Sequence, residues 1–150
     1  MNRKFWHFDT DVYKMHVGLY LGELAKCDPK WMQRRIKAAW PDIAPSDDEG
    51  RLDFPVPDEG VYADCLTVHV PSGHVVRIVR IPQFRKNVAN DHAVLAHETL
   101  HLAASALAWY GVKEPEGESE ALAYLFETVY GRFLDVLYRT LKKEKTKDGD

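Results

Sequence analysis

The sequence has little cysteine, no excess of charge of one sign and no long apolar run. Cys27 and Cys65 are the only cysteines and lie far apart, so neither a zinc ribbon nor a Cys-x-x-Cys redox motif is indicated. No segment is apolar enough over the length of a secretory signal or a membrane-spanning helix. We therefore expect a reduced, cytoplasmic protein with no membrane partner.

The balance of charges argues against a phosphate-rich partner. Lysine and arginine number 20 against 23 acidic residues, which gives a formal net charge of -3. Such a chain has no overall basic bias, so we expect no nucleic-acid partner. Arg34, Arg35 and Lys37 do cluster in one predicted helix. A solvated helix face is the favoured interpretation of this cluster, and nucleic-acid binding is a weaker hypothesis.

The length of 150 residues suits one domain with a real core. We expect this domain to cover residues 1–142. The remaining residues, 143–150, are highly charged, and we expect them to form a flexible tail.

The pattern of apolar and turn residues predicts an α+β fold. Part of 5–22 is expected to be a strand, and Asp28-Pro29 should open a short helix that Pro41 ends. Residues 62–70 and 74–81 alternate as two strands of a hairpin around Pro71-Ser72-Gly73. Long helices are expected at 90–110, capped by Asn90 or Asp91, and at 119–142. We predict a small antiparallel sheet, made of the hairpin and an N-terminal strand, packed on the two C-terminal helices.

Histidine and glutamate interrupt the Ala- and Leu-rich run 94–104 in the pattern His97-Glu98-x-x-His101. Residues four apart lie above one another on a helix, so both imidazoles can reach one point, with Glu98 beside it. We expect this helix to be buried, so that its polar groups need a partner, and a divalent metal would supply one. The pattern predicts a Zn²⁺ site with Glu98 as general base. A chance match, or histidines that only hydrogen-bond in the core, are the alternatives.

A catalytic zinc needs three protein ligands and an open position for water. No histidine follows His101, which excludes a third histidine six residues downstream. The acidic segment 116–124 is the obvious source of the third ligand, although its glutamates would also be favourable as plain charges near a helix N-terminus.

Over residues 62–140 the chain resembles the gluzincins, zinc metallopeptidases in which a Glu from a following helix joins His-Glu-x-x-His. Within that class it resembles small proteins encoded by phages and prophages. The resemblance implies a minimal zincin-like domain that hydrolyses a peptide or protein substrate. It implies His97, His101 and Glu120 as metal ligands and Glu98 as the catalytic base. Glu118, then Glu116, Glu127 or no glutamate at all, are the alternatives to Glu120. Gluzincins commonly carry an Asp four residues after the ligand, where this chain has Tyr124.

A different class of function is also consistent with the sequence. A zinc-stabilised binding module could keep a peptidase framework without turnover.

A peptidase would also use a further donor to the oxyanion. This donor could come from Tyr110, Tyr124, Tyr130 or His92, and the sequence does not choose among them. It indicates neither a particular substrate nor an oligomeric state.

Overall fold

The computed structural model describes residues 3–44, 52, 54, 60–112 and 120–147. The chain forms two compact units, residues 1–83 and 84–150, and each is described by itself. The α+β class is confirmed, whereas the expectation of one domain over residues 1–142 stays a prediction. The composition of residues 45–50, with a proline, a glycine and three acidic residues, predicts an exposed loop, and this run lies outside the described residues.

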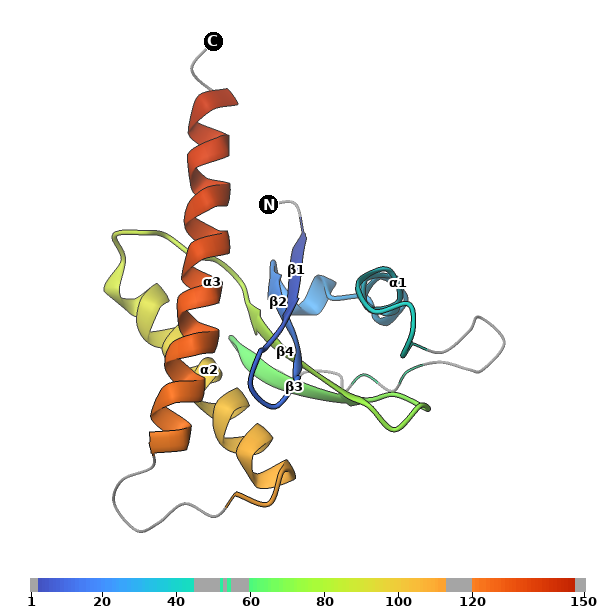
Figure 1. Ribbon diagram of the computed structural model, residues 1–150. Coiled ribbons are helices and arrows are strands. Elements are labelled where there is room, and N and C mark those ends of the chain that lie inside the picture. The colour runs from blue at the N-terminus through green and yellow to red at the C-terminus, as the bar shows by residue number, and fades with distance from the viewer. Residues whose placement is uncertain (1–2, 45–51, 53, 55–59, 113–119, 148–150) are drawn as a thin grey trace. The chain divides into compact units, whose positions relative to one another are not determined.

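The first unit is built on a four-stranded mixed sheet with the order β1-β2-β4-β3 (Figure 1). Its strands are β1 (Lys4–Asp9), β2 (His16–Leu21), β3 (Asp64–His69) and β4 (Val75–Ile81). The predicted hairpin is present as the antiparallel pair β3–β4, and β1 pairs antiparallel with β2. The prediction of a wholly antiparallel sheet is wrong at the centre, because β2 and β4 run parallel.

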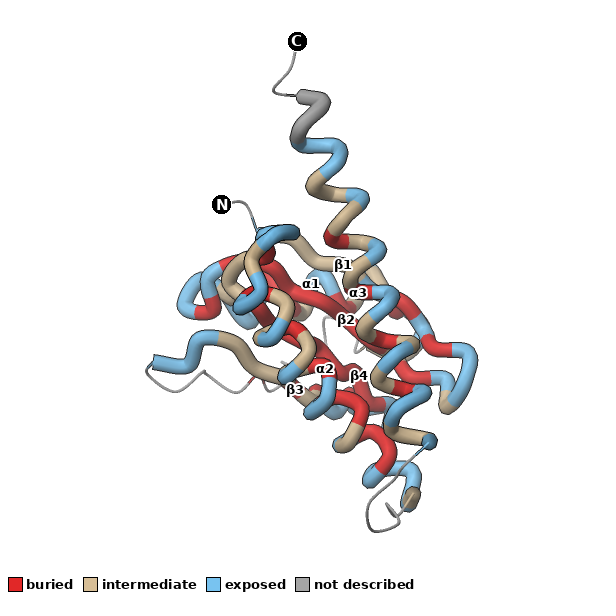
Figure 2. The backbone as a smooth tube through the Cα atoms, turned by 90° about the vertical axis from the view of Figure 1, so that its left-hand side faces the viewer, coloured by how far each residue is buried: buried red, intermediate tan, exposed pale blue. Residues whose placement is uncertain are grey.

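Helix α1 (Pro29–Ala39) lies between β2 and β3 in the chain. Asp28 caps it by accepting a hydrogen bond from the backbone N–H of Lys30 at 2.9 Å, and Pro29 occupies its first turn, as predicted. Trp31, Met32 and Ile36 of α1 belong to one apolar core cluster with sheet residues such as Ile78. A short 3-10 helix, η1 (Leu24–Lys26), precedes α1. The central strands β2 and β4 are buried along most of their length, and the edge strand β1 is more open (Figure 2).

The second unit consists of α2 (Ala89–Trp109) and α3 (Glu120–Lys147), which contact each other (Figure 1). Four apolar residues of α3 are buried at a spacing of one helical turn, namely Leu125, Val129, Phe133 and Leu137. Apolar residues at helical spacing in the sequence predict a core stripe made of Leu122, Phe126, Val129, Phe133, Val136 and Leu137. Val129, Phe133 and Leu137 are buried as this predicts, whereas Leu122, Phe126 and Val136 are only half-buried. Helix α3 continues to Lys147, five residues beyond the predicted end at Lys142.

Helix α2 begins without the side-chain cap that the sequence suggested. Its N-cap residue is Val88, which makes no capping hydrogen bond through its side chain. Asp91 instead reaches back beyond the helix start and accepts hydrogen bonds from the Arg85 backbone N–H and Nε, each at 2.8 Å. A third bond joins Arg85 NH2 to the other carboxylate oxygen at 3.0 Å. The carboxylate fixes the segment that leads into α2.

We expect Asp91→Asn to lower the free energy of unfolding by about 1–3 kcal/mol at pH 7, because it weakens charge-assisted bonds to a buried carboxylate. Hydrogen bonds from the Arg85 side chain lower the pKa of Asp91. This contribution is therefore complete above the unfolded value of about 4 and is lost as the pH falls through the folded pKa. Urea unfolding followed by circular dichroism at pH 7 and pH 3 measures it.

The matched control is Asp135→Asn. Asp135 pairs with Arg139 on the exposed surface of α3, and such pairs contribute less than about 1 kcal/mol. Equal losses in the two variants, or a loss for Asp91→Asn that does not shrink on acidification, would contradict the role given to Asp91.

Candidate metal centre

The two histidines of the motif converge as their spacing predicts. His97 and His101 lie one turn apart on α2, with their Nε2 atoms 3.0 Å apart. The ring centroids are 4.6 Å apart and the ring planes meet at 77°. In the absence of a metal, the neutral Nε2–H of one ring can donate to the Nε2 lone pair of the other. A cation bound by both nitrogens would take the place of that proton.

The donor atoms and the spacing of this pair are compatible with two of the ligands of a zinc ion. Tetrahedral zinc with Zn–N bonds of about 2.0–2.1 Å places two ligand nitrogens about 3.3 Å apart. The distance found here is 3.0 Å, so a small opening of two exposed side chains would suffice. Imidazole nitrogen is a common zinc ligand when the ring is neutral. His97 and His101 would therefore hold two of the positions around such an ion.

The expectation of a helix buried on nearly every side is wrong. His97 and His101 are both exposed, and the buried positions of α2 lie on a separate face that includes Leu95, Thr99 and Leu102. Thr99 satisfies its own hydroxyl by donating to the backbone oxygen of Leu95 at 2.7 Å. Burial therefore does not force a metal onto the histidines. Their convergence is the remaining argument for one.

The third ligand stays a prediction. Glu120 is exposed and is the first residue of α3. Within the described ranges, no group of three His, Cys, Asp or Glu side chains is placed to hold a metal ion. Glu116 and Glu118 lie outside those ranges, and Glu127 is exposed on α3. Of the carboxylates in the described ranges, one would have to move toward the two imidazoles to complete a three-ligand set.

Glu98 follows His97 directly and is half-buried, so it is less open to solvent than either histidine. On a helix it is turned about 100° from His97, so it lies on the helix face next to that of the two imidazoles. A carboxylate on this neighbouring face is a candidate to accept a proton from a water molecule held by the metal.

Two candidates for an oxyanion donor already have other partners. His92 Nε2 lies 2.8 Å from the backbone oxygen of Lys86, which can only accept, so Nε2 carries the proton. His92 Nδ1 is then the acceptor for the hydroxyl of Tyr130 at 3.4 Å. The His92 ring also packs edge-on against Phe84, with centroids 4.8 Å apart. These contacts give His92 and Tyr130 a structural role between α2 and α3, whereas Tyr110 and Tyr124 are exposed.

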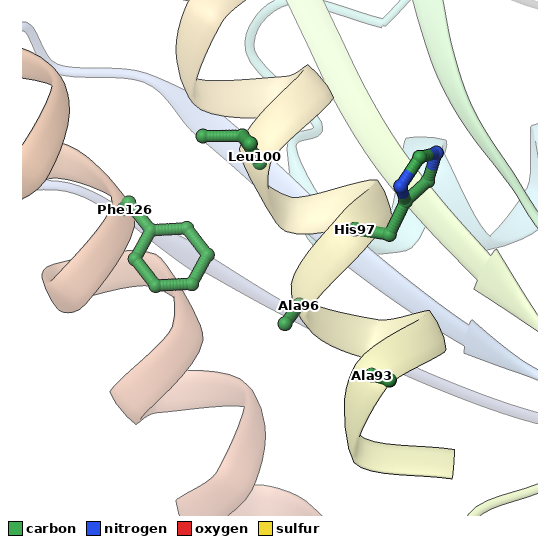
Figure 3. Close-up of a pocket in the computed structure, with 5 residues that line it drawn as sticks. All are labelled: Ala93, Ala96, His97, Leu100 and Phe126. Carbon is green, nitrogen blue, oxygen red and sulfur yellow. The ribbon is translucent and has the colours of Figure 1, made fainter. Parts of the chain in front are cut away.

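The sequence did not indicate the apolar hollow of about 340 Å³ that adjoins the histidine pair. It is lined by Ala93, Ala96, His97 and Leu100 of α2 and by Phe126 of α3. Figure 3 shows the imidazole of His97 pointing away from Phe126, so the ring lies at the rim of the hollow. Part of the signal lies in the sequence, because the small residues Ala93 and Ala96 leave space on one helix face. The exposure of Leu100 beside them is known only from the structure.

Comparisons with protein-family models, curated proteins and solved structures find no match to this chain. Among the described residues, no helix combines the length and the apolar character needed to cross a bilayer.

Proposed function

We propose that the protein is a zinc-dependent peptidase with its metal on α2. The observation that carries this proposal is the 3.0 Å approach of the Nε2 atoms of His97 and His101, with Glu98 in the intervening turn. The pattern His-Glu-x-x-His on a helix is a zinc-binding arrangement of metallopeptidases, in which the glutamate serves as general base. Its resemblance to the gluzincins gives the proposal its third ligand, Glu120.

Each residue then has a distinct task. Zinc, when bound, supplies a Lewis acid that makes water a nucleophile at neutral pH and polarises a carbonyl. His97, His101 and Glu120 hold the ion. A carboxylate oxygen of Glu98 accepts a proton from the attacking water and later donates it to the nitrogen of the leaving amine.

The apolar hollow is an argument for a peptide substrate. It adjoins His97, and its other lining side chains are hydrocarbon, namely Ala93, Ala96, Leu100 and Phe126. An apolar side chain of a substrate that binds in this hollow would remove its own surface and the apolar lining of the hollow from water. A peptide with an aliphatic or aromatic residue next to the cleaved bond fits this arrangement.

The first test is metal content. We expect the purified protein to bind about one equivalent of zinc. His97→Ala and His101→Ala should each lose most of it, because each variant keeps only two of the three expected ligands. Metal analysis after dialysis measures this. His69→Ala is the matched control, since His69 is exposed at the end of β3, and it should keep its zinc.

Zinc content unchanged in His97→Ala would contradict the proposed site. Unfolding on addition of EDTA, together with no cleavage of a broad peptide panel, would favour the zinc-stabilised binding module instead. Both imidazoles are exposed and lie outside the buried face of α2, so the packing of that face does not depend on a metal held by them. This favours the peptidase over a module that zinc stabilises. We therefore expect the protein freed of zinc to keep its helical circular dichroism at 25 °C.

A further inference from the structure

Positive charge is concentrated on the solvent face of α1. Lys30, Arg34 and Lys37 follow one another at four and three residues, so they form one line along the helix. Lys30 and Arg34 are exposed and Lys37 is half-buried. The helix Pro29–Ala39 contains four basic residues and no acidic residue. We call Lys30, Arg34 and Lys37 the basic stripe.

Two arginines beside the stripe are held in place by Trp31. The guanidinium carbons of Arg3 and Arg35 each lie 5.0 Å from the centre of the Trp31 ring. Arg3 also donates to the backbone oxygen of Lys26 at 3.1 Å. Stacking on an aromatic ring restricts a guanidinium while its N–H groups stay available at the edge. These arginines lose less conformational freedom on binding an anion than free side chains would.

We propose that the basic stripe, with Arg3 and Arg35, binds the phosphate backbone of double-stranded nucleic acid without regard to sequence. The stripe spans about 10 Å of helix, which is long enough to reach about two or three phosphates of a duplex. The net charge of the chain argued against such a partner, but charge averaged over the chain does not describe one face of one helix.

Other anionic partners fit this face less well. A membrane surface would require apolar side chains exposed among the basic ones, whereas Trp31, Met32 and Ile36 are all buried. A single strand would require an open aromatic ring for base stacking, and Trp31 is only 9% exposed with two guanidinium groups over it. A duplex keeps its own bases stacked and needs only phosphate contacts.

The experiment measures fluorescence anisotropy of a labelled 20-base-pair DNA titrated with the full chain. We expect binding at 50 mM NaCl that weakens about 10- to 40-fold at 200 mM, as contacts to two or three phosphates predict. Changing Lys30, Arg34 and Lys37 together to Gln should weaken binding at least tenfold at 50 mM NaCl and flatten the salt dependence. The matched control changes Arg132, Lys142 and Lys143, exposed residues of α3, to Gln and should bind as the unaltered protein does.

Three results would overturn the proposal. They are no binding at 50 mM NaCl, an equal loss in the control variant, or binding of polyglutamate or of anionic vesicles as tight as that of the duplex. A normal circular dichroism spectrum confirms that each variant is folded. Arg35→Gln is a second variant that leaves the basic stripe intact and should weaken binding by a smaller factor.

Discussion

Glu98→Gln is expected to lower kcat for peptide cleavage by about 10²- to 10⁴-fold, the usual contribution of a general base. The change keeps the size of the side chain but removes the carboxylate that accepts the proton of the attacking water. Zinc should stay bound near one equivalent, because Glu98 is not among the proposed ligands. Activity and metal content measured on the same preparation distinguish loss of the base from loss of the metal.

The control for this experiment is Glu144→Gln on the exposed surface of α3. It removes the same charge and should leave both activity and zinc unchanged. Glu120→Gln should instead reduce zinc binding, since it alters a proposed ligand. Full activity in Glu98→Gln would contradict the assigned base, and loss of its zinc would show that Glu98 acts on the metal site itself.

Periodicity and turn residues were sufficient to predict most elements of the fold. The hairpin followed from alternation around Pro71-Ser72-Gly73, and α1 followed from Asp28-Pro29 at its start. The parallel pairing of β2 with β4 was not predictable in this way. It depends on which strand of the hairpin lies next to β2, and local sequence does not specify that choice.

The candidate site shows a similar division. The four-residue spacing correctly predicted that His97 and His101 approach each other, because helix geometry alone determines it. Their exposure was not predictable from the Ala-rich surroundings, since alanine suits both buried and exposed helix positions. The sequence could not show that His92 of α2 and Tyr130 of α3, which are 38 residues apart in the chain, form a hydrogen bond with each other.

A buried arginine in the sheet of the first unit gives the largest expected effect on stability. Arg80 of β4 is 2% exposed, and Asp64 lies directly opposite it on β3. Arg80 Nε donates to Asp64 Oδ1 at 2.7 Å, and Arg80 NH2 donates to Asp64 Oδ2. The alternation of the strand placed Arg80 on a face with Val76 and Ile78 but could not show that this face is buried. The carboxylate compensates a charge that has almost no access to water.

Asp64→Ala is therefore expected to lower the free energy of unfolding by about 3–5 kcal/mol, because it leaves a buried guanidinium without its counter-charge. Replacing both partners, as Asp64→Leu with Arg80→Met, should recover most of that loss, since the cost comes from the unpaired charge.

Glu23→Ala is the matched control. It breaks the exposed Lys26–Glu23 pair and should change stability by less than about 1 kcal/mol. Urea unfolding followed by tryptophan fluorescence suits this test, because three of the four tryptophans, Trp6, Trp31 and Trp40, lie in the first unit. A loss below about 1 kcal/mol for Asp64→Ala would mean that water reaches Arg80 when its partner is removed.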